Sequence, residues 1–265
     1  LAGVPAQVGV AVILDGTDTV TVNNSADYPM MSMFKLHEAI AVCRTLGERG
    51  QTIDTVFNIP RSELHTDTWS PMLKDYTADT VRISARGLMD YLLVHSDNNA
   101  SNLLFSLVAT APQTDSIIRG ITSDGAFNIS YTEAQMQREH DLAYANRTSP
   151  PAYAELVDRL FTDSLAPTPM QDFIKDAMSR CNTGTPRLQA GLPDKEGVKF
   201  AHRTGSGYVN ERGDVVAVND GGRVSLPDGR SYSVAVFVKD YAGPQEDAEK
   251  VIARISEAIY RHITE

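Results

Sequence analysis

The chain lacks the features that mark disulfide-rich, membrane-spanning and nucleic-acid-binding proteins. Its 265 residues contain only two cysteines, Cys43 and Cys181, which cannot build a disulfide framework and do not have the spacing of metal ligands. The longest apolar run covers residues 8–14, far short of the ~20 residues that a membrane-spanning helix needs. Acidic residues number 34 and basic ones 24, whereas nucleic-acid phosphates are bound by clustered Lys and Arg. What is present, 42% hydrophobic and 22% charged residues, is typical of a globular protein.

The hydrophobic pattern divides the chain into strand-like ends and a helical middle. Residues 7–16 end in an Asp-Gly turn and residues 18–23 alternate, which together predict a β-hairpin. Apolar residues recur at helical spacing over much of 32–178 and again after Pro244. Three more strands are predicted, over residues 198–209, 214–226 and 231–240.

This order predicts an α+β fold with a split domain. Residues 1–30 and 180–265 are expected to form one discontinuous domain, a five-stranded antiparallel sheet flanked by the terminal helix. Residues 31–179 are expected to form an inserted all-helical domain. An active site is expected at the junction, because ligand pockets favour the interface between domains.

The segment Ser32-Met-Phe-Lys35 is the first candidate for chemistry. A three-residue step at a helix start places both side chains on one face, so the lysine can lie near the hydroxyl. A serine needs an adjacent base to become a nucleophile, and a desolvated lysine can lose its proton near neutrality. Taken alone, the segment is equally compatible with a helix cap followed by a solvated lysine.

Two further motifs follow in the chain. Ser96-Asp97-Asn98 lies between two predicted helices, where a plain polar turn that caps the second helix is the alternative. Arg203-Thr204-Gly205 lies within a predicted strand, and a glycine there marks either a bend or the close approach of a ligand. Each motif is common by chance, whereas all three in this order are a signature of class A β-lactamases and penicillin-binding proteins.

On these motifs the sequence resembles the class A serine β-lactamases over essentially its whole length, and most of all the branch with cephalosporinases and extended-spectrum enzymes. The resemblance implies the β-lactamase/DD-peptidase-like fold and hydrolysis of β-lactam antibiotics through a covalent serine acyl-enzyme. It identifies Ser32 as the nucleophile, Lys35 as proton acceptor or relay, and Ser96 as donor to the departing nitrogen. Glu133, at the family's distance before Pro150, corresponds to the glutamate that activates water for deacylation.

The resemblance also implies the substrate-binding residues. Asn98 would bind the amide side chain of the substrate and help to hold Lys35, and the N–H groups of Ser32 and Ser206 would form the oxyanion hole. Arg203 and Thr204 would face the substrate carboxylate. The remaining positions at the substrate are Gly205 on the same strand, Trp69 at the rim and Gln137 near the deacylating water.

Four positions depart from the family pattern. Arg203 replaces the commoner lysine, keeps the charge, but practically never loses its proton. Gln137 replaces an asparagine, so we expect the same amide function with altered geometry. Tyr131 and Asn146 occupy the positions of an Arg–Asp ion pair that braces the Ω-shaped loop, which leaves the conformation of the loop open. Arg212 is a candidate for the carboxylate-binding arginine of many members.

Two rival functions stay open at this stage. A penicillin-binding DD-peptidase is also acylated by β-lactams but acts on cell-wall peptides, and a binding module would keep the pocket without the chemistry. For a β-lactamase we expect no metal and no cofactor, and as ligands β-lactam substrates and mechanism-based inhibitors. We further expect a monomer that is periplasmic or secreted, with its signal peptide removed, and that binds neither nucleic acid nor membranes.

Overall fold

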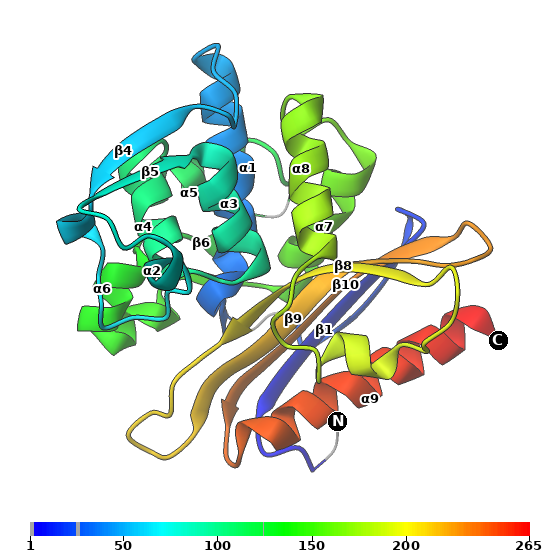
Figure 1. Ribbon diagram of the computed structural model, residues 1–265. Coiled ribbons are helices and arrows are strands. Elements are labelled where there is room, and N and C mark those ends of the chain that lie inside the picture. Colours follow the sequence, from blue (N-terminus) through cyan, green and yellow to red (C-terminus); the bar gives the residue numbers. More distant parts are fainter. Residues whose placement is uncertain (1–2, 25–26, 124) are drawn as a thin grey trace.

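A computed structural model describes residues 3–24, 27–123 and 125–265. Its main feature is a five-stranded antiparallel sheet with the order β2-β1-β10-β9-β8. The two ends of the chain meet in this sheet, because β1 pairs along its whole length with β10 (Figure 1). The expected five-stranded sheet is therefore confirmed, with strands β1 (Gln7–Leu14), β2 (Asp18–Val22), β8 (Lys199–Ser206), β9 (Val215–Ser225) and β10 (Ser231–Tyr241).

Helices cover both faces of the sheet, and the central strands are buried on both sides. Helix α9 (Gln245–Thr264) packs on one face, and α7 (Pro150–Thr162) packs on the other (Figure 1). Side chains alternate between the faces along a strand. In β10, Val236 accordingly joins the apolar cluster that includes Ile252 of α9, while Phe237 joins the cluster of the helical part.

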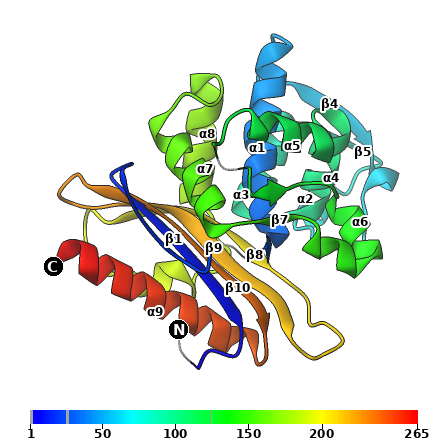
Figure 2. The same ribbon diagram turned by 180° about the vertical axis from the view of Figure 1, so that it is seen from behind.

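The segment 31–179 is mostly helical but not all-helical as expected. It also holds a two-stranded sheet, β4-β5, and two strands of the three-stranded sheet β3-β7-β6 (Figure 2). Strands β3, β6 and β7 have only two residues each, too few to show an alternating pattern, so periodicity did not predict these three. These strands are β3 (Tyr28–Pro29), β4 (Val56–Pro60), β5 (Thr80–Ser84), β6 (Phe127–Asn128) and β7 (Arg147–Thr148).

Helices of four to fifteen residues make up most of this segment. Four short 3₁₀ turns connect elements along the described chain: η1 (Met31–Met33), η2 (Arg61–Glu63), η3 (His140–Tyr144) and η4 (Leu188–Gly191). The α-helices besides α7 and α9 are α1 (Phe34–Glu48), α2 (Met72–Asp75), α3 (Ala85–Val94), α4 (Asn98–Leu107), α5 (Ala111–Arg119), α6 (Glu133–Arg138) and α8 (Thr168–Ser179).

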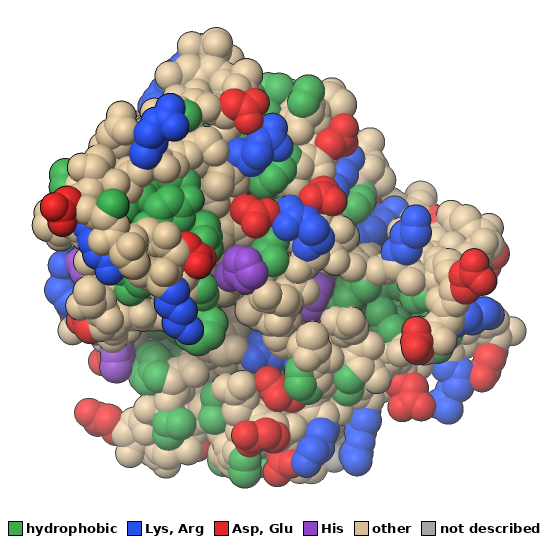
Figure 3. Space-filling view, viewed as in Figure 1, with side chains coloured by type: hydrophobic (Ala, Val, Ile, Leu, Met, Phe, Trp, Pro, Cys, Tyr) green, Lys and Arg blue, Asp and Glu red, His purple; other side chains and the backbone are tan. Residues whose placement is uncertain are grey.

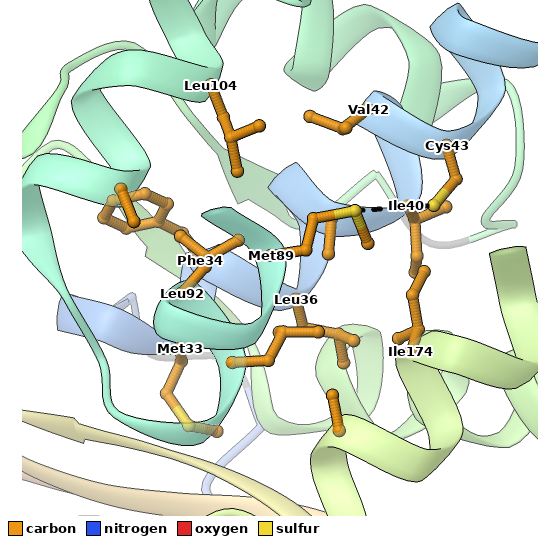
Figure 4. Packing of buried hydrophobic residues seen from close by; sticks show 14 of the residues in the cluster. Met33, Phe34, Leu36, Ile40, Val42, Cys43, Met89, Leu92, Leu104 and Ile174 are labelled. Carbon is orange, nitrogen blue, oxygen red and sulfur yellow. Dashed lines mark hydrogen bonds between the residues drawn. The ribbon is translucent and has the colours of Figure 1, made fainter. Parts of the chain in front are cut away.

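Helix α1 runs through the centre of the helical part and is buried nearly all round. Figure 4 shows Leu36 and Ile40 of α1 among apolar side chains from α3, α4 and α8. Cys43 is part of this core: its thiol contacts the sulfur of Met89 at 3.9 Å, and burial raises its pKa to about 12. A helix held on every side is a rigid base for residues at its N-terminus.

Charges of both signs are interspersed over the face of the molecule in Figure 3, without a continuous basic area. Over the described ranges, no helix combines the length and the apolar character that a membrane crossing requires.

Candidate active site

Ser32 lies in η1, directly before α1, and the backbone next to it is strained. The preceding residue, Met31, has a φ of +47°, a left-handed conformation that non-glycine residues rarely adopt. Such outliers persist only where the surrounding structure enforces them, and they gather at functional sites. The Ser32 hydroxyl donates a hydrogen bond to Glu133 Oε1 at 3.2 Å, across 101 residues of sequence.

Lys35 is completely buried below Ser32 and makes three polar contacts. Its Nζ donates to the Ser96 carbonyl oxygen at 2.9 Å and to Asn98 Oδ1 at 2.6 Å. It also lies 2.9 Å from Glu133 Oε1, so one carboxylate oxygen contacts both the hydroxyl and the ammonium. Burial lowers the pKa of Lys35, and Glu133 opposes this effect, whereas the charge of Arg203 adds to it. This lysine is therefore easier to deprotonate than a lysine in solution.

A second carboxyl group, Glu38, lies one turn further along α1. Burial raises its pKa well above the ordinary value, although a hydrogen bond from Ser101 at 2.7 Å and the charge of Lys35 act in the other direction. Glu38 is accordingly easier to protonate than a glutamate in solution, and Glu133 is the carboxyl group that contacts Lys35 directly.

Glu133 is the first residue of α6, and local sequence explains why the helix begins there. Thr132 and Gln135 form a capping box, in which each side chain bonds to the backbone of the other residue. The next backbone N–H, of Ala134, donates to Asn102 Oδ1 of α4 at 3.0 Å. The cap and this bond to α4 together fix the position of the carboxylate.

Asn146 takes the structural place of the missing ion pair. Its Oδ1 accepts from the N–H of Ser130 at 2.9 Å and of Tyr131 at 3.0 Å, and its Nδ2 donates to the Tyr131 carbonyl at 2.8 Å. The Asn146 carbonyl in turn accepts from the Met30 N–H, just before Met31. The side chain and the backbone of this one buried residue thus join the start of the Glu133 loop to the segment before Ser32.

Replacement of Asn146 by alanine is expected to destabilise the protein and to slow its reaction. Two N–H groups that lose their acceptor cost about 1–3 kcal/mol each where water cannot replace it. Urea unfolding and steady-state kinetics would measure both effects, with the exposed Asn24 as the matched control in Asn24→Ala. Unchanged stability and activity in Asn146→Ala would contradict this role.

The turn at Ser96, Asp97 and Asn98 combines capping with site chemistry. Asp97 is buried, caps α4 through the Ala100 N–H at 2.9 Å, and accepts hydrogen bonds from the loop before α2. Ser96 has a φ of +59°, which turns its carbonyl toward Lys35. Asn98 Nδ2 donates to Thr68 Oγ1 at 2.9 Å, so its amide connects Lys35 to the Trp69 loop.

Strand β8 passes behind this turn, and its alternation corrects one expectation. Arg203 and Thr204 were both expected to face a substrate carboxylate, but neighbouring residues of a strand point to opposite faces. Arg203 is fully buried and donates through Nη2 to Ser96 Oγ at 2.5 Å, whereas Thr204 lines the cavity. At Gly205 a Cβ would collide with the Met30 carbonyl oxygen, so glycine lets β8 approach η1 closely.

A second buried arginine, Arg187, contacts a side chain that lines the cavity, and the sequence did not predict it. It is buried, donates to Ser206 Oγ at 2.5 Å and to the Gly205 carbonyl at 3.0 Å, and pairs with Glu249 of α9 at 3.1 Å. Arg212, the candidate from the sequence, is exposed and pairs with Asp214 at 3.0 Å. Arg187 lies in an irregular segment without periodicity, so no sequence signal marked it.

A cavity of about 440 Å³ opens over these groups. Trp69 is at its rim with 63% of its surface exposed, and its Nε1 donates to the His95 carbonyl at 2.9 Å. The amide of Gln137 donates to the Asp67 carbonyl at 3.3 Å, across the mouth. The predicted residues that line the cavity are Ser32, Trp69, Ser96, Asn98, Glu133, Gln137, Thr204 and Ser206, while Lys35, Arg203 and Gly205 lie behind it.

Further lining residues carried no sequence signal. Thr183 lies between α8 and η4, and its hydroxyl is 2.5 Å from that of Thr204. The rings of Tyr208 and His140 contact each other in a tilted arrangement with centroids 4.6 Å apart, and both residues line the cavity. Among the residues that the structure describes, no three His, Cys, Asp or Glu side chains are grouped so as to hold a metal ion.

Comparison with known proteins agrees with this geometry. The model of the "Beta-lactamase enzyme family" matches residues 1–263. A β-lactamase of Phocaeicola vulgatus is 48% identical over 256 residues, which cover 97% of this chain and 80% of the relative. The solved structure of the TLA-1 extended-spectrum β-lactamase has a TM-score of 0.96 at 31% identity, covering 100% of this chain and 95% of that chain. A class A β-lactamase from Bacteroides cellulosilyticus DSM 14838 has a TM-score of 0.93 at 29% identity and covers 98% and 93%. The chain belongs to the β-lactamase enzyme family and has the fold of its class A members.

Proposed function

We propose that this protein hydrolyses β-lactam antibiotics by a covalent route that begins at Ser32. The Ser32 oxygen attacks the carbonyl carbon of the four-membered ring, and the carbon–nitrogen bond breaks. The serine proton passes to Lys35, whose Nζ contacts the same Glu133 oxygen as the Ser32 hydroxyl, and Lys35 returns this proton to the ring nitrogen through Ser96. A lysine with a lowered pKa suits this relay because it can both accept and return a proton.

Deacylation is assigned to Glu133. A water molecule attacks the serine ester, Glu133 takes its proton, and the ring-opened product leaves while Ser32 regains its hydrogen. The support is the position of the carboxylate, whose Oε1 is 3.2 Å from the serine oxygen. Gln137 would help to hold this water from the cavity wall.

The opposite wall would bind the substrate. Thr204 and Ser206 lie on one face of β8 and offer hydroxyl groups to the carboxylate of a β-lactam. Arg187 donates to the Ser206 hydroxyl and brings a positive charge toward that anion. The N–H groups of Ser32 and Ser206 would bind the oxyanion, Asn98 would bind the amide side chain, and Trp69 would cover the mouth.

The single observation that carries the proposal is the shared contact of Glu133 Oε1 with Ser32 and Lys35. This contact places a base within reach of the serine ester, so that water can hydrolyse it. A DD-peptidase, in contrast, stays acylated by a β-lactam. Because the substrates act outside the cytoplasm, we further propose a periplasmic or secreted protein without its signal peptide. It would act as a monomer, since all the residues invoked come from one chain.

The test is turnover of a chromogenic cephalosporin and of a penicillin, followed by mass spectrometry of the intact protein. We expect many turnovers per molecule and no stable adduct. A long-lived penicillin adduct with release of D-alanine from a D-Ala-D-Ala peptide would indicate a DD-peptidase instead. Absence of both colour change and adduct would indicate a binding module.

A further inference from the structure

A second group of nucleophilic and titratable side chains lies outside the serine cavity. Cys181 follows α8, His202 belongs to β8, and Asp220 belongs to β9. His202 Nδ1 is 2.8 Å from Asp220 Oδ1, and the Cys181 sulfur lies 3.3 Å from the Thr183 hydroxyl and interacts with His202. A thiol, an imidazole and a carboxylate in this order are the elements of an activated cysteine.

The imidazole of His202 is held in one orientation. The ring of Phe200 stacks on it with centroids 4.4 Å apart, and Asp220 is itself fixed because its Oδ2 accepts from the Leu188 N–H at 3.1 Å. Since Nδ1 is bound to Asp220, Nε2 is the nitrogen left for the thiol. A ring fixed in this way can act on the thiol in only one orientation.

The charges around the sulfur favour a thiolate. Burial by itself would raise the pKa of Cys181, but the hydrogen bond and charge of His202, with the charge of Arg203, outweigh it and lower the pKa to about 6. Burial would lower the pKa of His202, but Asp220 and Cys181 raise it. Both shifts favour a thiolate paired with an imidazolium.

The thiol is also within reach of small molecules. Cys181 and His202 both line a cavity of about 320 Å³ beside the sheet, which is separate from the serine cavity. Cys181 is 8% exposed, whereas Cys43 is enclosed in the apolar core with its pKa raised. Cys181 thus has both a lowered pKa and access to a cavity, whereas Cys43 has neither.

We propose that Cys181, His202 and Asp220 form a thiol-reactive site, distinct from the serine site, which takes small soft electrophiles such as hydrogen peroxide. The sulfur of Cys181 attacks one peroxide oxygen and the O–O bond breaks. The second oxygen leaves as hydroxide and takes a proton from His202, forming water. The sulfur is oxidised by two electrons to sulfenic acid and the peroxide is reduced.

Groups from each neighbouring element set the pH dependence of this reaction. Besides the triad itself, the charged and titratable groups near the thiol are Arg203 of β8, Tyr153 of α7, and Asp194 and Lys195 of the loop that lines the cavity. Of these groups, Arg203 acts directly on the thiol, because its positive charge favours the thiolate.

The test uses the unmodified protein with Cys43 as internal control. Peroxide followed by dimedone, and separately iodoacetamide at several pH values, would label the protein, and peptide mass spectrometry would assign the label. We expect dimedone on Cys181 alone. We expect the rate at which Cys181 reacts with iodoacetamide to level off near neutral pH. The rate for an ordinary thiol would still be rising there, because its pKa is about 8.5. A label on neither cysteine, or a Cys181 rate that rises only above about pH 8, would overturn the proposal.

Two variants distinguish activation of the Cys181 thiol by His202 from simple exposure of that thiol to the reagent. In His202→Asn the amide can still donate to Asp220, and the labelling rate of Cys181 at pH 7 is expected to fall about tenfold because the thiolate fraction falls. Phe200→Leu removes the stacked ring but keeps the His–Asp pair, so its pH profile should keep the midpoint of the parent protein. An unchanged pH profile in a folded His202→Asn protein would refute the role of the imidazole.

Discussion

Replacement of Ser32 by alanine is expected to lower β-lactam turnover by about 10⁴-fold or more, as in other enzymes that lose a covalent nucleophile. The structure gives the reason: Glu133, Lys35 and the cavity all converge on this one oxygen. The variant loses a single, partly buried hydrogen bond, so its stability should stay close to that of the parent. Turnover of a chromogenic cephalosporin and the mass of the protein after exposure to substrate are the two measurements.

The matched control for this experiment is Ser116→Ala, because Ser116 is exposed on α5 and does not line the cavity. It should keep full activity and form the same transient adduct as the parent. If the Ser32→Ala protein kept a tenth of the parental rate, or still gained the mass of the substrate, the nucleophile would have to be another group.

Much of this site could be predicted from local sequence. Ser32 and Lys35 belong to one helix start, and Ser96 and Asn98 belong to one turn, so short spacings describe them well. The hydrophobic pattern placed the strands of the sheet and α9, which bring the two ends of the chain together. Glu133 followed only from the resemblance, because a single carboxylate has no pattern of its own.

What could not be predicted depends on contacts between distant segments. Arg187 has its partners in β8, β9 and α9, and nothing in its irregular segment reveals them. Asn146 holds the loop through side-chain bonds to the backbone of residues 130–131, a substitute for an ion pair that no spacing suggests. For Arg203, strand alternation was the available signal, and it separates this side chain from Thr204.

Replacement of Glu133 by glutamine should separate the two halves of the reaction. The amide cannot take a proton from water, so the serine ester should form and then persist. It also removes the negative charge 2.9 Å from the buried Lys35 ammonium, which shifts that lysine further toward its neutral form. We expect steady-state turnover to fall about 10³-fold, with a rapid burst of one product per molecule.

Rapid quenching and intact mass spectrometry would show the trapped ester in Glu133→Gln and, at the same delay, almost none in the parent protein. Glu139→Gln is the matched control, since Glu139 follows α6 directly but is exposed and does not line the cavity. Fast turnover of Glu133→Gln with no adduct would show that another base activates the water. If the variant were slow and never gained the mass of the substrate, Glu133 would be needed for acylation. Its contacts with Ser32 and Lys35 would then have to be reinterpreted.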